Sequence, residues 1–124
     1  MRHGKSSWDL QVSDVDRPLN QRGIDDAHRM GAFLATKNIE INGAYTSTAN
    51  RAAHTALIVL REMNIPPHKL SVSKMLYDFS GEDVLEFVRC LPDEQQIVIT
   101  FGHNHACNAL AHSLGGFDGG NIPT

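Results

Sequence analysis

Helix-like and strand-like segments alternate along this chain of 124 residues, and this alternation is the strongest constraint on its fold. Apolar residues recur at helical spacing in four segments, residues 20–36, 48–63, 80–91 and 104–114. Shorter segments of strand character lie between them, at residues 43–46, 69–73 and 96–101. The alternation predicts an α/β fold, a three-layer sandwich in which helices flank a mainly parallel central sheet.

The ends of the predicted helices are marked by residues with known terminal preferences. Asn20 is suited to be the N-cap of the first helix, and Gly115 is expected to stop the fourth. In the second helix, Leu57 is predicted to lie on the buried side together with alanines and Leu60.

Composition limits the classes of protein to consider. The length fits one domain, 1–124, and the net charge of -3 provides no general attraction for nucleic acid or anionic membranes. Neither a membrane-spanning apolar segment of ~20 residues nor a signal-peptide pattern is visible in this sequence. Cys90 and Cys107 lack a metal or redox spacing. We therefore expect a cytoplasmic domain with reduced thiols and no nucleic-acid or membrane partner.

Three polar clusters carry the functional prediction. One lies at the start of the chain, residues 2–7, and the others follow predicted strands, at residues 46–51 and 102–104. In open α/β sheets ligands bind beyond the carboxyl ends of strands, where helix N-termini also favour anions. Arginine has a planar fork of donors that matches phosphate oxygens. Two arginines and two histidines at this edge therefore indicate a site for a multiply charged oxyanion.

The same clusters carry a family resemblance. The letters RHGKSSW at 2–8, DRPLNQRG at 16–23, TSTANRAAHT at 46–55 and GHN at 102–104 occur in order along the chain. Together they resemble the histidine phosphatase superfamily, and within it the short SixA-type phosphohistidine phosphatases. The resemblance implies a phosphoglycerate mutase-like fold and a phosphatase that forms a covalent phosphohistidine and acts on protein phosphohistidine.

The resemblance also implies roles for individual residues. His3 would be the nucleophile, Arg2 and Arg51 would clamp the phosphoryl oxygens, and His103 would face His3 and donate to the same oxygens. We expect His3 to act deprotonated and His103 to be protonated. Further substrate-binding positions in the matching motifs are Gly4, Asn20, Arg22 and Asn104.

Three acidic residues are candidates for the proton donor to the leaving group. Asp78 is the first candidate for a general acid, with Glu82 and Asp83 as second choices, and the alternative is that Asp78 only caps a turn. An imidazole leaves more readily than an alkoxide, so a phosphatase without a strong acid would favour phosphohistidine. The expected partner is a phosphorylated protein or a small phosphorylated molecule. A small-molecule phosphomonoesterase and a non-catalytic phosphoprotein-binding module of the same fold are the alternatives.

Two other histidine-based functions are disfavoured. His103 and His105, with His112, could suggest zinc, but their spacing places them on no common helical face and no cysteine or carboxylate completes a set. The run Gly102 to His105 superficially resembles a nuclease His-Asn-His motif, yet the chain lacks the basic face that a nuclease needs. We therefore expect neither a metal nor another cofactor.

The resemblance also raises an expectation about the ends of the chain. In the family, a central strand leads into the Arg-His-Gly motif, whereas only Met1 precedes Arg2 here. The family usually has another strand after the point where residues 121–124 end this sequence. We expect the single domain to lack the family's first and last strands, the natural protein to extend beyond both ends, and the 124-residue form alone to fold poorly.

Overall fold

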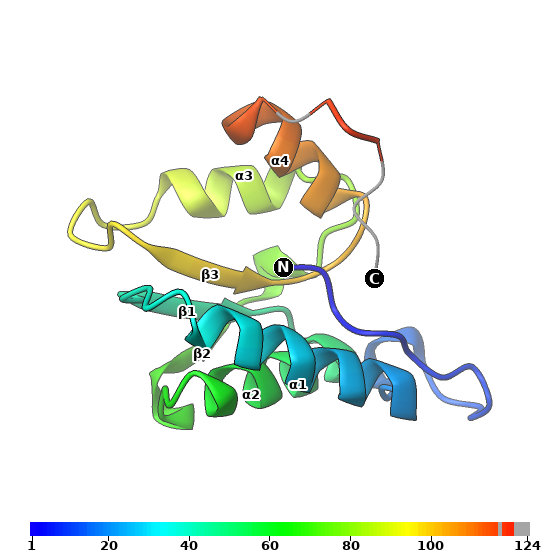
Figure 1. The fold of residues 1–124 in the computed structure, drawn as a ribbon. Helices are drawn as coiled ribbons and strands as arrows, with labels where there is room; N and C mark the ends of the chain where they lie inside the picture. Colours follow the sequence, from blue (N-terminus) through cyan, green and yellow to red (C-terminus); the bar gives the residue numbers. More distant parts are fainter. Residues whose placement is uncertain (117, 121–124) are drawn as a thin grey trace.

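A computed structural model of the chain describes residues 1–116 and 118–120 and shows an α/β domain (Figure 1). Its helices and strands, in chain order, are α1 (Gln21–Ala35), β1 (Gly43–Thr46), α2 (Asn50–Glu62), β2 (Leu70–Val72), α3 (Glu82–Arg89), β3 (Val98–Phe101) and α4 (Ala106–Gly115). Short 3-10 turns lie between them, η1 (Asp14–Asp16), η2 (Pro67–Lys69) and η3 (Lys74–Leu76).

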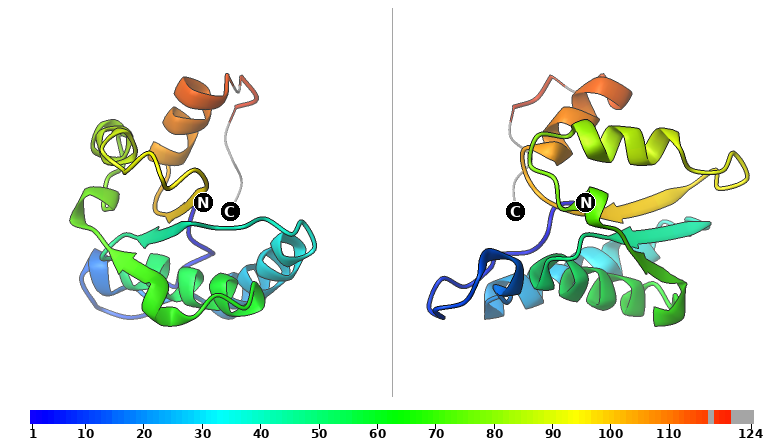
Figure 2. Two further views of the ribbon diagram at one scale, coloured as in Figure 1. Left: turned by 90° about the vertical axis from the view of Figure 1, so that its left-hand side faces the viewer. Right: turned by 180° about the vertical axis from the view of Figure 1, so that it is seen from behind.

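The strands form a parallel sheet in the order β2-β1-β3. Ala44 in the central strand pairs with Leu70 on one side and with Ile99 on the other. Helices α1 and α2 cover one face of the sheet, and α3 and α4 lie on the opposite face (Figure 2). The predicted α/β sandwich with a mainly parallel sheet is therefore confirmed.

The start of the chain lies against the end of β3. Arg2 forms a parallel bridge with Gly102, the residue after that strand, and the His3 N–H donates to the Gly102 carbonyl at 2.9 Å. This pairing places His3 at the carboxyl edge of the sheet.

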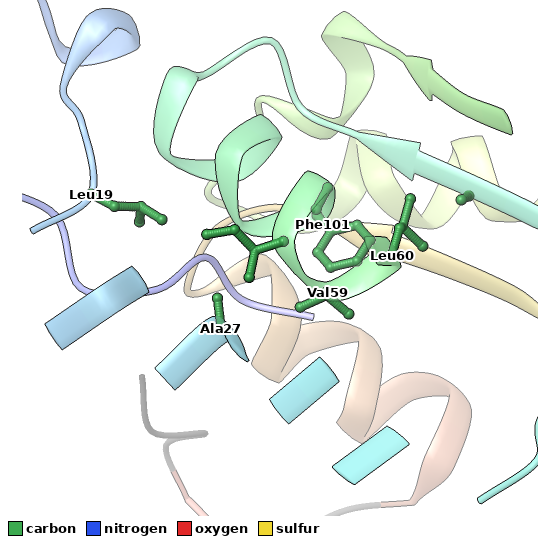
Figure 3. Packing of buried hydrophobic residues seen from close by; sticks show 8 residues of the cluster. Leu19, Ala27, Val59, Leu60 and Phe101 are labelled. Atoms are coloured by element: carbon green, nitrogen blue, oxygen red, sulfur yellow. The ribbon is translucent and has the colours of Figure 1, made fainter. Parts of the chain in front are cut away.

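The main hydrophobic core lies between the sheet and the helices α1 and α2 (Figure 3). Val59, Leu60 and Phe101 are its most deeply buried large members, and Leu19 and Ala27 close it at the α1 side. A smaller cluster on the other face joins Leu76, Val84 and Ala106. Burial of this apolar surface on both sides fixes the sheet between its helices.

Several local predictions differ from the structure. Leu57 is 41% exposed, while Ile58 is buried, because α2 turns residue 58 toward the sheet and residue 57 toward solvent. Gly115 is the last residue of α4, and the helix stops at Gly116, which adopts a left-handed φ of 61°.

No helix within the described part of the chain is long and apolar enough to cross a membrane. The segment 121–124, after which we expect a further strand, lies outside the described residues.

Candidate active site

The structure brings the three polar clusters together at the carboxyl edge of the sheet. β1 leads into Ser47, whose N–H donates to the carbonyl of Phe101 at the end of β3. The His3 and His103 ring centroids lie 5.3 Å apart, and Arg51 contacts both rings. The site therefore consists of two facing imidazoles beside a buried guanidinium, as expected from the positions of these residues after strands.

His3 is held in one tautomer. Its Nδ1 lies 2.6 Å from the Gly4 carbonyl oxygen, which can only accept, so Nδ1 carries the proton. Its Nε2 accepts a hydrogen bond from Arg51 Nε at 3.2 Å. Burial, together with the charges of Arg51 and Arg2, lowers the pKa of His3 to about 4. At neutral pH the ring is therefore uncharged, with the Nε2 lone pair directed into the site.

The backbone after His3 lies closely against the first turn of α1. Gly4 N–H donates to Thr55 Oγ1 at 3.0 Å, and Asn20 N–H donates to the Lys5 carbonyl at 2.9 Å. A Cβ on Gly4 would lie 2.7 Å from the Gly23 carbonyl oxygen, and one on Gly23 would lie 2.2 Å from that of Lys5. Glycine at both positions permits this approach, which fixes the carbonyl that orients His3.

Arg51 lies in the first turn of α2 and is only 1% exposed. The Nε of Arg51 faces His3. Its Nη1 donates to the Asp14 carbonyl at 2.5 Å, and its Nη2 donates to Asp14 Oδ2 at 2.9 Å. The same Nη2 lies 3.4 Å from His103 Nδ1. A buried cation requires such pairing, because moving an unpaired ion out of water costs on the order of several kcal/mol.

His103 is also almost fully buried, with Nε2 2.8 Å from Ser47 Oγ. Burial and the positive charge of Arg51 lower the pKa of His103 to about 3. A protonated His103 is therefore disfavoured in the site without a bound anion, and its protonation during a reaction stays a prediction. The reason is that Arg51 Nη2 faces Nδ1, which must present a lone pair to this donor. With Nδ1 unprotonated, the proton of the neutral His103 ring lies on Nε2, which donates to Ser47 Oγ.

Arg17 belongs to the site but was not singled out from the sequence. It is 7% exposed, its Nη1 donates to Ser6 Oγ at 2.9 Å, and its guanidinium lies 3.5 Å from the centre of the Trp8 ring. With Arg2, His3, Lys5, Ser6 and Trp8 it lines a cavity of about 180 Å³. The signal was present in the DRPLNQRG run, where Arg17 follows Asp16, but spacing alone does not show that its side chain turns inward.

Other predicted site residues have different positions. Asn20 caps α1 by accepting from Gly23 N–H at 2.9 Å. The Arg22 side chain is 70% exposed and pairs with Asp26, so the structure does not bring it to the site. Asn104 follows His103, and its buried Oδ1 meets no hydrogen-bond donor among the residues that the structure describes. Substrate binding by Gly4, Asn20 and Asn104 stays a prediction.

Asp78 has the geometry of a helix cap. Its carboxylate accepts hydrogen bonds from Ser80 N–H and Oγ–H and from Gly81 N–H, each at 2.8 Å, and from Val84 N–H at 3.3 Å. Burial acts to raise the pKa of Asp78, but these hydrogen bonds outweigh it and hold the pKa below its ordinary value. A carboxyl group stabilised in its ionised form is a poor proton donor, so the structure favours the capping alternative over the general-acid prediction.

Carboxylates do not form a metal site beside these residues. Across residues 1–116 and 118–120, no group of three or more His, Cys, Asp or Glu side chains is arranged to hold a metal ion. The positive charge beside His3 comes from the guanidinium groups of Arg51, Arg2 and Arg17.

The fold places arginine and histidine side chains together at the carboxyl edge of a parallel sheet, and comparison with known proteins places the chain in a family. The family model of the histidine phosphatase superfamily (branch 1) matches residues 1–72, more than half of the chain. The chain therefore belongs to the histidine phosphatase superfamily, as its motifs predicted.

The chain is similar to several individual members. A 2,3-bisphosphoglycerate-dependent phosphoglycerate mutase from Azorhizobium caulinodans is 38% identical over 68 residues, which are 52% of this chain and 33% of that protein. A mutase of the same name from Methylorubrum extorquens (strain PA1) is 38% identical over 65 residues, 50% of this chain and 31% of that protein. These matches span about a third of the length of the mutases.

Solved structures extend the similarity over the whole chain. The protein histidine phosphatase SixA complexed with tungstate has a TM-score of 0.82 at 27% identity, covering 100% of this chain and 78% of that one. A mycobacterial glucosyl-3-phosphoglycerate phosphatase complexed with VO3 has a TM-score of 0.63 at 16% identity, covering 91% and 77%. The second likeness shows the shared fold alone.

Proposed function

We propose that this chain is a phosphatase that forms a covalent phosphohistidine on Nε2 of His3, and that its substrate is protein phosphohistidine. The observation that carries the proposal is the hydrogen bond from His3 Nδ1 to the Gly4 carbonyl, which leaves Nε2 as the nucleophilic nitrogen. The low pKa of His3, about 4, supports it, because only the neutral ring can attack phosphorus.

The reaction proceeds in two steps. His3 Nε2 attacks phosphorus, the Nε2–P bond forms, and the bond from phosphorus to the leaving group breaks. The leaving group departs with the bonding electron pair and takes a proton from water. Water then attacks the phosphoryl group, the Nε2–P bond breaks, and inorganic phosphate and a proton are released. His3 returns to its starting tautomer, which the Gly4 carbonyl has held throughout.

Charge stabilisation is the protein's main contribution to such a reaction. The Arg51 Nε–H, which donates to His3 Nε2 in the empty site, can turn to a phosphoryl oxygen once Nε2 bonds to phosphorus. Arg2 lines the same cavity as His3 and adds a second positive charge. Losing one such donor typically costs roughly 100- to 1000-fold in rate.

The substrate proposal depends on the leaving group. Asp78, the predicted acid, is engaged in capping α3, so it offers little help to an alkoxide. An imidazole leaving group needs less help, which favours phosphohistidine. The likeness to a protein histidine phosphatase along the whole chain supports the same substrate. The alternatives are a small-molecule phosphomonoesterase and a module that binds phosphate without turnover. The similarity to phosphoglycerate mutases suggests a third alternative, in which the phosphoryl group is transferred to a second acceptor molecule instead of to water.

A substrate panel tests this proposal. A phosphohistidine protein, an aryl phosphate, a sugar phosphate and a phosphoglycerate would be compared for phosphate release by the wild type, His3→Ala and His28→Ala. His28 pairs with Glu62 on the outer helices and is the matched histidine control. We expect turnover of phosphohistidine to be fastest, abolished by His3→Ala and kept by His28→Ala. Activity of His3→Ala within tenfold of the wild type, a barrier change of only ~1.4 kcal/mol, would show that another residue attacks.

A further inference from the structure

The two donor edges of the Arg51 guanidinium face different groups. The side edge, formed by Nε and Nη2, faces the two imidazole nitrogens of the site, His3 Nε2 at 3.2 Å and His103 Nδ1 at 3.4 Å. The end edge, formed by Nη1 and Nη2, is bound by one residue, Asp14, through its carbonyl at 2.5 Å and its Oδ2 at 2.9 Å. Each edge of a guanidinium can bind one bidentate acceptor, so the end edge is already filled from within the protein.

Asp14 also accepts hydrogen bonds from two side chains other than Arg51. The Tyr77 hydroxyl donates to the same Oδ2 at 2.6 Å, and Arg17 Nε donates to Oδ1 at 3.1 Å. The hydrogen bond from Tyr77, and then those from Arg51 and Arg17, lower the pKa of Asp14 to about 2, so it is ionised at neutral pH. The Tyr77 ring also packs edge-on against His103, with centroids 5.2 Å apart. The Asp14 carboxylate thus contacts Arg51 of α2, Tyr77 after η3 and Arg17 after η1.

We propose that Asp14 is a positioning residue, which fixes the end edge of Arg51 so that its side edge presents Nε–H and Nη2–H to two oxygens of the phosphoryl group. This inference rests on the proposed function of the site. Without Asp14, the guanidinium could change its orientation, and the two donors that face His3 and His103 would lose their common direction. Catalysis depends strongly on such placement, because a shift of ~1 Å can cost roughly 100-fold in rate.

The opposite role would be an internal anion that competes with phosphate for Arg51. The geometry disfavours it, because Asp14 binds the end edge of Arg51 and leaves the side edge to His3 and His103. The two roles predict opposite changes on removal of the carboxylate. Loss of a positioning group weakens anion binding and slows turnover, whereas loss of a competitor strengthens anion binding.

The test compares three variants in the full chain. Asp14→Ala removes the carboxylate. Asp14→Asn can place its amide oxygen where Oδ2 lies and keep the contacts to Arg51 and Tyr77, while it loses the contact to Arg17. Asp16→Ala is the matched control, because its carboxylate lies in the same short turn and accepts from Ser13 instead. The assays are kcat and KM for an aryl phosphate and the affinity for orthovanadate.

We expect Asp14→Ala to lower kcat/KM roughly 10- to 100-fold and to weaken vanadate binding, with Asp14→Asn within about threefold and Asp16→Ala within about twofold of the wild type. In an Arg51→Lys background, Asp14→Ala should change kcat/KM less than about twofold, because the fork that it positions is gone. This coupling would not arise from a purely structural role.

Contrary results are equally definite. Asp14→Ala equal to the Asp16→Ala control, tighter vanadate binding, or a full additional loss in the Arg51→Lys background would each overturn the inference about Asp14. Absence of turnover of both the aryl phosphate and a phosphohistidine protein by the wild-type chain would instead contradict the proposed function. In that case vanadate binding by Asp14→Ala and Asp14→Asn would still show whether the carboxylate positions Arg51.

Discussion

Replacing Thr55 with valine should destabilise the segment that orients His3. Thr55 is 2% exposed, and its hydroxyl accepts from Gly4 N–H at 3.0 Å while it donates to the Arg51 carbonyl at 2.8 Å. Valine has a similar shape but no hydroxyl, so the Gly4 N–H would lose its acceptor. An unsatisfied buried donor costs about 1–3 kcal/mol, so we expect the free energy of unfolding to fall by roughly 2 kcal/mol.

The assay for this prediction is thermal unfolding followed by circular dichroism, with Thr55→Ser as the control that keeps the hydroxyl. For a domain of this size, a loss of roughly 2 kcal/mol corresponds to a Tm lower by about 8 °C. The valine variant should also have the lower kcat/KM, because the Gly4 carbonyl that holds His3 Nδ1 would be less well fixed. If the two variants melt within about 1 °C of each other, the contact of Thr55 with Gly4 does not stabilise this segment.

Three further predictions follow from the same geometry. Gly23→Ala should lower the free energy of unfolding by roughly 2 kcal/mol or more in urea titrations, because its Cβ would clash with the Lys5 carbonyl, while Gly115→Ala, with open space around it, should not. The pKa values of His3 and His103, about 4 and about 3, lie below the ordinary 6.5, so the unfolded chain takes up protons first and stability should fall as the pH drops from about 6.5 toward 4. For His103 the free energy of unfolding should be lower by about 2 kcal/mol at pH 5 than at neutral pH. The urea midpoint of His103→Gln should therefore depend less on pH than that of the wild type, and an equal dependence in the two proteins would refute this prediction. Turnover should survive exhaustive chelation with EDTA, because arginines supply the charge; loss on chelation with recovery by one divalent ion would contradict this.

Much of the fold could be predicted because its signals are local. The N-cap at Asn20 and the strand Gly43–Thr46 agree with the structure, since capping and strand character depend on neighbouring residues. The meeting of Arg51 with His103 could also be anticipated, because both follow parallel strands whose carboxyl ends share one edge. The exposure of Leu57 could not be predicted. Helical spacing marks a wide apolar face of the helix, and only tertiary packing decides which residues at the edge of that face are buried.

The part of the site that the sequence did not reveal depends on long-range contacts. Asp14 lies in the short 3-10 turn η1 and binds Arg51, 37 residues away in the sequence, and Tyr77, 63 residues away. Likewise, the protonation of His103 cannot be inferred from residue type, because a neighbouring guanidinium and burial lower its pKa. Such side-chain networks become visible only when the loops are placed in three dimensions.

The most direct test of the central claim is to identify the phosphorylated atom. The wild-type chain would be mixed with a phosphorylated substrate, quenched under alkaline conditions and analysed by peptide mass spectrometry and by 31P NMR against both phosphohistidine isomers. Because Nδ1 of His3 donates to the Gly4 carbonyl, we expect phosphate on His3 at Nε2 alone. Phosphate at Nδ1, phosphate on another residue, or substrate turnover without any phosphoenzyme under conditions that trap it would show that His3 Nε2 is not the nucleophile.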